Sequence, residues 1–102
     1  MKTETINIIT IKQYSDSLLL ENPVFYSKLK KINIDGVVPD ELFLEVLKFM
    51  YLVSIIKVKL TPSIIVDYGW HEFILFTKLY DQFCTEKFGR FIHHTPDDGK
   101  TT

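Results

Sequence analysis

The stretch that most constrains the fold of this chain of 102 residues runs from Leu42 to Ile56. It is apolar almost throughout, and the interruptions are Glu45, Lys48 and Ser54. A helix that is apolar on nearly every side must be covered on several sides by the rest of the chain. The run is also much shorter than the ~20 apolar residues that a membrane-spanning helix needs. We therefore predict a central, buried helix over residues 39–57, opened by Pro39.

A second helix is predicted over residues 22–33 from its start signal. Asn22 can cap a helix with its side chain, and Pro23 suits the first helical position, where no N–H is needed. Gly36 then stands in a short connection before Pro39, where a glycine favours a turn.

A third helical pattern covers residues 62–88. Thr61 or Ser63 caps it, and Gly89 is a natural C-terminal stop. Thr77 offers a second start inside the pattern, so the segment is either one helix or two, over 63–75 and 78–88.

The N-terminal residues give a mixed signal. The β-branched residues Ile6, Ile8, Ile9 and Ile11 favour an extended segment, whereas Ile8, Ile11, Tyr14 and Leu18 fall at helical steps. We predict a mainly α fold: a compact bundle of three to four helices in a single domain over residues 1–102. Residues 1–13 form an irregular or partly helical arm, and residues 97–102 form a peripheral tail. The alternative is an α+β fold in which residues 6–11 pair as a strand with residues 56–60.

Composition narrows the class of protein. The net charge is −1, which argues against the basic face that nucleic-acid binding needs. The single cysteine, Cys84, has no partner for an internal disulfide, which fits a reducing compartment. Glu4 interrupts the place where a signal peptide begins its apolar run. We expect a cytoplasmic protein that binds neither nucleic acid nor membranes.

The three histidines of the chain lie in "DYGWHEF" and "GRFIHHTP". Asp67 and His71 are one helical turn apart and share a face, while His93 and His94 follow the Gly89 stop. If the loop folds back, Asp67, His71 and His93 or His94 can meet. Imidazole and carboxylate are ligands that zinc accepts, so a zinc-like divalent metal is the cofactor this cluster suggests. The structural alternative, which we favour, is a surface Asp67–His71 pair and a loop histidine bound to a backbone carbonyl.

Other catalytic signals are missing from the sequence. The zinc-protease motif needs a second histidine at the fourth step after His71, where Leu75 stands. There is no glycine-rich phosphate loop and no nucleophile elbow. On a continuous helix Cys84 lies nearly opposite His71, so we expect a buried core cysteine. These observations favour a protein that is not an enzyme.

The same segment is rich in aromatic side chains. Residues of this kind usually fill a core, but they are also enriched at the centres of protein interfaces. The candidates for an interaction surface are Trp70, Phe73, Phe76 and Tyr80.

Residues 60–96 resemble small bacterial proteins of the glycine-rich domain-containing protein-like group. The resemblance rests on Pro62, Ser63, Val66, Asp67, Trp70, His71, Thr77, Tyr80, Phe83, Cys84, Phe88, Gly89, Phe91 or Ile92, His93, His94 and Pro96. It implies a compact helical domain and brings no activity. Related sequences often carry a second histidine where this chain has Phe73, which takes one ligand away from an implied metal site.

From these observations we predict a small accessory module that binds a protein partner, either a different protein or a second copy in a homodimer. The alternative is a metal-binding domain, structural or hydrolytic, built on Asp67, His71, His93 and His94.

Overall fold

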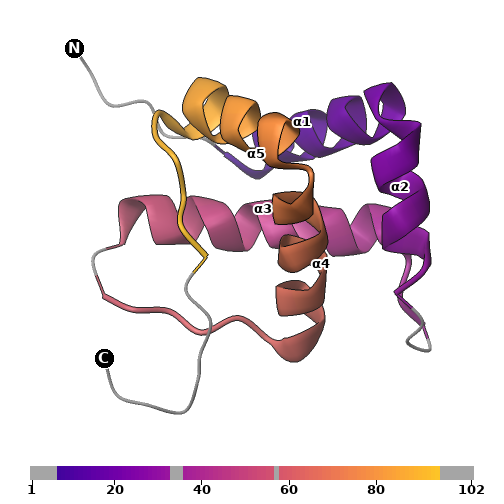
Figure 1. Cartoon of the computed structure of the whole chain (residues 1–102). Coiled ribbons are helices and arrows are strands. Elements are labelled where there is room, and N and C mark those ends of the chain that lie inside the picture. Colours follow the sequence, from indigo (N-terminus) through magenta and orange to yellow (C-terminus); the bar gives the residue numbers. More distant parts are fainter. Residues whose placement is uncertain (1–6, 33–35, 57, 95–102) are drawn as a thin grey trace.

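The central helix of the chain is α3 (Pro39–Ile55), as predicted (Figure 1). The computed structural model describes residues 7–32, 36–56 and 58–94. Pro39 starts the helix, and the carboxylates of Asp40 and Glu41 lie in its first turn, where they favour the positive end of the helix dipole. The helix buries Leu42, Phe43, Val46, Leu47 and Met50. It contacts α1, α2 and α4, so it is covered on several sides.

The N-terminal segment is a helix, α1 (Ile8–Glu21), so residues 8–13 take the helical and not the irregular form of the two that we predicted. The side chain of Asn7 accepts a hydrogen bond from the Thr10 N–H at 2.9 Å and caps the helix. Ile11 and Leu18 are buried, whereas Ile8 and Ile9 are exposed. Packing of the buried face onto α3 therefore outweighs the weak extended preference of the β-branched residues. Residues 1–6 lie outside the described part.

The α+β alternative is also wrong, because no strand occurs among residues 7–32, 36–56 and 58–94. Ile6 and Lys57, which belonged to the two expected strands, lie outside the described residues. A mainly α fold is confirmed. Among the described residues no helix is long and apolar enough to cross a membrane.

Helix α2 (Pro23–Lys30) starts at Pro23 as predicted, but Asn22 does not cap it with its side chain. Instead the Asn22 side-chain amide donates to the Leu18 carbonyl oxygen at 2.8 Å and satisfies the end of α1. The helix ends at Lys30, earlier than expected. Gly36 has a φ of 80°, a left-handed conformation that glycine adopts without steric cost.

The long segment forms three pieces: α4 (Ile64–Leu75), α5 (Thr77–Phe83) and a π-helical turn, η1 (Cys84–Phe88). The Ser63 hydroxyl accepts from the Val66 N–H at 3.2 Å and caps α4. The break falls at Phe76, with φ −90° and ψ 71°, so Thr77 is the first residue of α5 and not its cap. Gly89, at φ 83°, ends η1 in the left-handed conformation as predicted.

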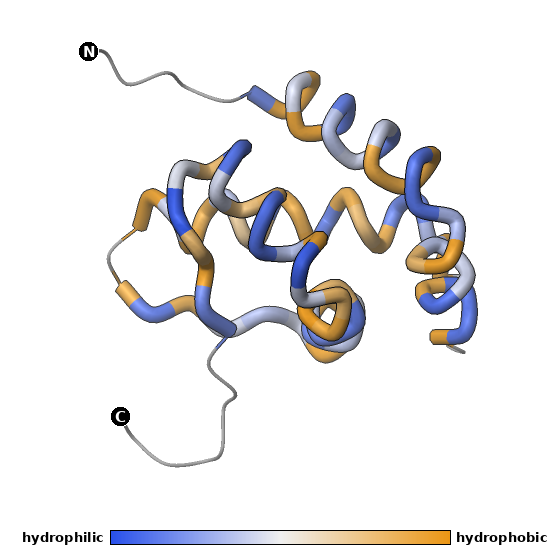
Figure 2. Tube along the Cα trace, turned by 45° about the horizontal axis from the view of Figure 1, so that its top comes forward, coloured by the Kyte–Doolittle hydropathy of each residue, from blue (hydrophilic) through white to orange (hydrophobic). Residues whose placement is uncertain are grey.

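Three phenylalanines from three helices meet at the centre of the core. Phe25 of α2, Phe43 of α3 and Phe73 of α4 are fully buried. Their ring centroids are 5.0–5.2 Å apart, with edge-to-face geometry between Phe43 and each of the other two. Such contacts contribute beyond the area they bury. Helix α1 also packs on α3, and in Figure 2 hydrophobic segments recur along both of these helices.

Helices α3 and α4 approach closely at Gly69. A Cβ atom at this position would lie 2.9 Å from Val46 Cγ2 and 3.1 Å from Leu42 Cγ, both on buried side chains of α3. Alanine favours a helix over glycine by about 1 kcal/mol. Overpacking of a filled core costs about 1–3 kcal/mol. We therefore expect Gly69→Ala to lower the free energy of unfolding by about 1 kcal/mol, the balance of these two effects.

Urea titration followed by circular dichroism measures this loss. Ser17→Ala is the control, because Ser17 is an exposed residue inside α1 that takes the same alanine without a packed neighbour. A Gly69→Ala protein more stable than wild type would contradict the close approach.

Candidate functional site

The two histidine-bearing stretches meet where the chain after Gly89 returns to α4. We call residues 90–94 the strap. Figure 1 shows it descending from the end of η1 and running back past α3 toward α4. Ile92, at its centre, is completely buried. The Arg90 guanidinium donates to the Ser54 carbonyl oxygen at 3.3 Å, which ties the strap to the end of α3.

A buried chain of hydrogen bonds fixes the strap from inside. The Trp70 indole N–H donates to the Tyr80 hydroxyl at 2.9 Å. That hydroxyl donates in turn to the Ile92 carbonyl oxygen at 2.5 Å. Trp70 and Tyr80 are almost completely buried, and burial raises the pKa of the Tyr80 phenol well above its usual range. The hydroxyl therefore stays protonated and supplies the partner that each neighbouring polar group needs.

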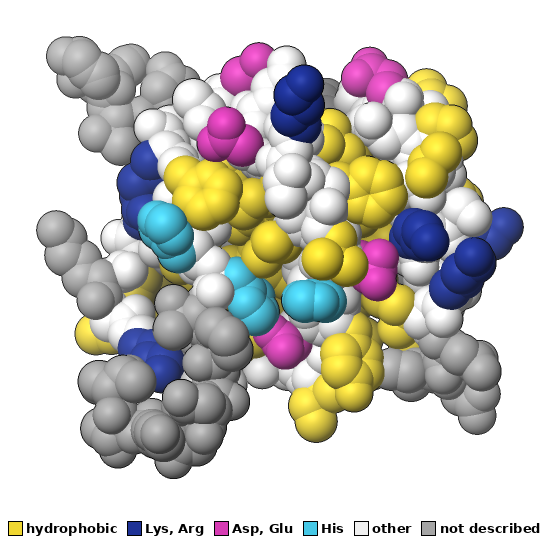
Figure 3. Space-filling model, viewed as in Figure 1, with side chains coloured by type: hydrophobic (Ala, Val, Ile, Leu, Met, Phe, Trp, Pro, Cys, Tyr) yellow, Lys and Arg dark blue, Asp and Glu magenta, His cyan; other side chains and the backbone are white. Residues whose placement is uncertain are grey.

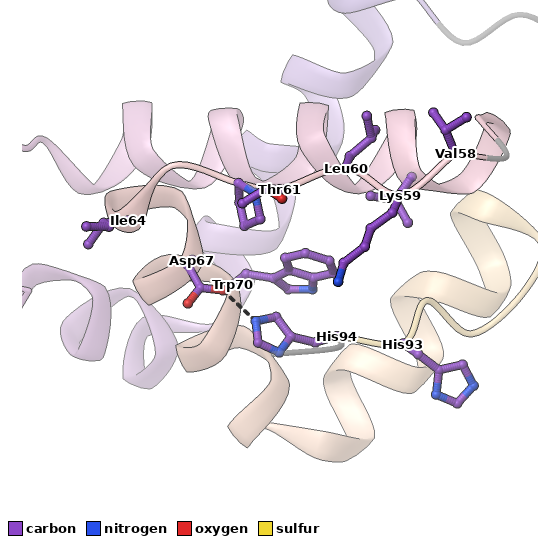
Figure 4. Close-up of a pocket in the computed structure, with 11 residues that line it drawn as sticks. Val58, Lys59, Leu60, Thr61, Ile64, Asp67, Trp70, His93 and His94 are labelled. Carbon is purple, nitrogen blue, oxygen red and sulfur yellow. Dashed lines mark hydrogen bonds and ion pairs between the residues drawn. The ribbon is translucent and has the colours of Figure 1, made fainter. Parts of the chain in front are cut away.

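At the surface the strap is fixed by His94 and Asp67. The His94 Nε2 and Asp67 Oδ1 atoms are 2.6 Å apart (Figure 4). An ionised carboxylate only accepts, so the His94 ring donates from Nε2 in this contact. The His94 ring also meets Trp70 edge to face, with centroids 4.6 Å apart. His94 is thus held by both a charge-assisted hydrogen bond and an aromatic contact.

His71 and His93 are placed differently from His94. The exposed His71 ring lies with its centroid 6.4 Å from that of His94. His93 packs against Phe91 at 4.8 Å, and Figure 4 shows its ring at the rim of the pocket, pointing away from Asp67. In the described part of the chain no group of three or more His, Cys, Asp or Glu side chains is arranged to hold a metal ion.

The Asp67–His94 pair should contribute measurably to stability. The two side chains are 44% and 13% exposed, so the pair is partly screened by water. Hydrogen bonds to charged groups contribute about 1.5–3 kcal/mol when shielded, and we expect about 1 kcal/mol here. The measurement is a double-mutant cycle with Asp67→Ala and His94→Ala, read as free energies of unfolding.

The matched control is the Lys12–Asp16 pair of α1, which is 3.1 Å apart and exposed on both sides. We expect its cycle to give about 0.3–0.5 kcal/mol. A coupling between Asp67 and His94 no larger than this would contradict a fastening role for the pair.

A pocket of about 400 Å³ opens beside this pair. Leu60 and Pro62, from the segment before α4, and Trp70 supply apolar wall, and Asp67 and His94 lie on one side. Figure 4 shows the Lys59 side chain extending toward the Trp70 indole. The pocket therefore combines apolar walls with a few polar groups, as binding pockets commonly do.

The aromatic residues predicted as an interaction surface face the interior. Trp70, Phe73 and Tyr80 are buried, and Phe76 is half-buried with its ring 5.3 Å from Phe25. These side chains are committed to the chain's own core and offer no accessible patch. They follow the inner face of α4 and continue into α5, where burial of apolar area stabilises the fold.

Cys84 is a buried free cysteine, as expected. Burial raises the pKa of its thiol, which lowers the fraction of reactive thiolate at neutral pH. It contributes to the core beneath the strap and not to the Asp67–His94 pair.

The face of α4 turned away from the core carries apolar residues that sequence reasoning missed. Ile64, Tyr68 and Leu75 are 71%, 51% and 58% exposed. With the exposed His71 they occupy positions 64, 68, 71 and 75, which lie on one side of a helix. We call these four residues the outer stripe. In Figure 3 histidine and hydrophobic side chains gather together over α4.

The described residues form a small helical domain. Its strap is held against α4 by two buried hydrogen bonds, from the Trp70 indole to the Tyr80 hydroxyl and from that hydroxyl to the Ile92 carbonyl oxygen. The chain belongs to the UCP032817-like family, whose family model matches residues 11–100. No curated protein matches the chain, and no solved structure matches it. The resemblance to the glycine-rich domain-containing group stays a prediction.

Proposed function

We propose that the protein is a small, non-enzymatic interaction module of the cytoplasm and that a protein partner binds the outer stripe of α4. The observation that carries this proposal is the exposure of Ile64, Tyr68 and Leu75 on a single helix face. A helix that is apolar all round is normally buried on all sides. Helix α4 carries no Asp, Glu, Lys or Arg at the four positions of the outer stripe, and the described chain leaves this face exposed.

The neighbouring pocket supports the same proposal. Ile64 belongs both to the outer stripe and to the wall of the 400 Å³ pocket, so stripe and pocket form one continuous surface. Val58, also strongly exposed, continues the apolar wall on the opposite side. An apolar side chain of a partner can enter the pocket while the rest of its surface lies along the stripe, the arrangement that produces binding hot spots.

The test compares three baits in extracts of the source cell. These are the wild-type protein, the charged variant Tyr68→Glu, and the control Leu20→Glu. Leu20 is 84% exposed on α1, away from the stripe, and tolerates the same kind of change. Circular dichroism first verifies that both variants fold. We expect a partner that wild type and Leu20→Glu retain and that Tyr68→Glu loses, with affinity then measured on the purified partner. If all three baits retain the same proteins, the stripe is not the binding surface.

The metal-binding alternative is supported by the short Asp67–His94 contact and by the His71 ring nearby. Against it, His93 points away from Asp67. The resemblance to the glycine-rich domain-containing group also implies a histidine at the position of Phe73, which this chain lacks. Elemental analysis of protein purified without a histidine tag separates the two proposals. A metal near one equivalent, with a lower melting temperature after chelation, would favour the metal site, because a structural metal is coupled to folding.

A further inference from the structure

The pocket beside the Asp67–His94 pair has the size and the mixed lining of a small-molecule site. Its volume is about 400 Å³, within the range of about 300–1,000 Å³ that ligand pockets commonly have. Four parts of the chain line it, namely α3, the segment 58–62, α4 and the strap. A ligand in this pocket therefore contacts the protein from several sides, which an exposed helix face alone does not provide.

Most of this lining is hydrocarbon. Apolar wall comes from Val53 of α3, from Val58, Leu60 and Pro62 of the segment before α4, and from Trp70. Val58 is 68% exposed, and Val53 and Leu60 are partly buried. Removal of apolar surface from water is favourable, so the hydrocarbon of a ligand is stabilised when it covers this wall.

The charged residues of the pocket favour an anionic ligand. Among the described residues that line it, Asp67 is the one carboxylate, and its Oδ1 atom already lies 2.6 Å from His94 Nε2. Lys59 contributes an ammonium group, and Figure 4 shows its side chain extending toward the Trp70 indole. An ammonium has three N–H donors, so Lys59 can contact a ligand as well as a group of the protein. The pocket therefore offers a charged donor, whereas its carboxylate already has a donor from the chain.

We propose that this pocket binds a small carboxylic acid. The carboxylate of the ligand accepts hydrogen bonds from the Lys59 ammonium, and its hydrocarbon body lies along the apolar wall. A charge-assisted contact of this kind is stronger than a neutral one. The inference goes beyond the proposed function and does not rest on it, because it concerns a small molecule in the pocket and not a protein on the outer stripe. A bound acid would occupy the space open to a partner's side chain, so it would compete with that partner.

Titration of the purified full chain with octanoate tests the proposal, and octanol is the uncharged probe with the same number of carbon atoms. The single tryptophan lines the pocket, so its indole resonance in a proton–nitrogen correlation spectrum reports occupancy. We expect saturable shifts of this resonance and of amide resonances from residues 58–62. The dissociation constant should be on the order of several hundred micromolar for a ligand of this size. Octanol should bind about tenfold more weakly, since it offers Lys59 no charged acceptor.

Two matched pairs of variants locate the site, after circular dichroism has verified that all four fold. Lys59→Met removes the ammonium and keeps an unbranched side chain, and Lys78→Met makes the same change at an exposed position of α5. Val58→Asp places a carboxylate in the apolar wall, and its control is Val24→Asp, at a 64% exposed position of α2. We expect Lys59→Met and Val58→Asp each to bind octanoate about tenfold more weakly, because one loses the charged donor and the other repels the ligand. Both controls should bind octanoate as wild type does.

Three results would overturn the proposal. The absence of saturation in wild type up to about 10 mM octanoate would remove the pocket as a binding site. Equal affinity for octanoate and octanol, or unchanged octanoate binding by Lys59→Met, would remove carboxylic acids as the ligand class. Shifts confined to residues that do not line the pocket would place octanoate elsewhere. Because no partner protein is present in these titrations, their outcome does not depend on the capture experiment.

Discussion

Replacing Phe73 with alanine is expected to lower the free energy of unfolding by about 4 kcal/mol. Phe73 is fully buried, and its ring lies within 4.9–5.6 Å of four other rings, those of Phe25, Phe43, Tyr80 and Phe83. Alanine leaves a cavity among side chains from three other helices, α2, α3 and α5, none of which can collapse into it alone. Because small domains are stable by about 5–15 kcal/mol, this single change removes a large share of the total.

Urea unfolding, monitored by circular dichroism and by the fluorescence of the single tryptophan, measures the loss. Phe91→Ala is the matched control, because Phe91 is 38% exposed and its ring contacts those of Tyr80 and His93. We expect this control to lose about 1 kcal/mol. Equal losses in the two variants would mean that Phe73 is not at the centre of the core.

Tyr80→Phe is expected to cost about 3 kcal/mol although it removes only one oxygen atom. Without the hydroxyl, the Trp70 indole N–H loses its acceptor and the Ile92 carbonyl oxygen loses its donor. Both groups stay buried, and each buried polar group without a partner costs about 1–3 kcal/mol. The strap should loosen first, since the carbonyl oxygen of Ile92 at its centre loses this hydrogen bond.

Tyr26→Phe is the control for the same chemical change. The Tyr26 hydroxyl donates to Asp40 Oδ1 at 2.8 Å on the surface, where water replaces the lost partner. We expect a much smaller loss than for Tyr80→Phe in urea unfolding at pH 7. Similar losses in the two variants would contradict the buried chain of hydrogen bonds.

The contribution of Tyr80 should also depend on pH. Burial raises the pKa of Tyr80 in the folded protein above its unfolded value of about 10. The stabilisation is therefore fully present below about pH 10 and is lost as the pH rises above it, because only the unfolded chain then releases the proton readily. The advantage of wild type over Tyr80→Phe should shrink in that alkaline range.

Local signals in the sequence predicted several helix ends correctly. Pro23, Pro39 and Gly89 each act through their own backbone, so their effect does not depend on what packs nearby. The form of α1 stayed open in the sequence because its isoleucines suit an extended segment as well as a helix, and only packing on α3 decides between them. The π-helical turn at Cys84–Phe88 has no local signal of its own.

The candidate site was predictable only in its residue types. Asp67 and a loop histidine were expected to come close, and the structure brings His94 and not His93 to the carboxylate. Two adjacent histidines on a loop point to different sides, and the sequence does not tell which one faces inward. The outer stripe was missed for a related reason. Helix α4 carries aromatic and aliphatic side chains on more than one face, so its pattern does not reveal that Trp70 and Phe73 are buried while Tyr68 is exposed.

The most direct measurement is hydrogen exchange at the Trp70 indole. We hold that Ile92 of the strap, Tyr80 and Trp70 form one buried unit. The chain has one tryptophan, so its indole N–H gives a single resonance in a proton–nitrogen correlation spectrum. We predict that this proton exchanges only when the strap or the whole domain opens, and faster in Tyr80→Phe than in wild type. Exchange in wild type at the rate of a solvent-exposed indole would contradict the buried unit.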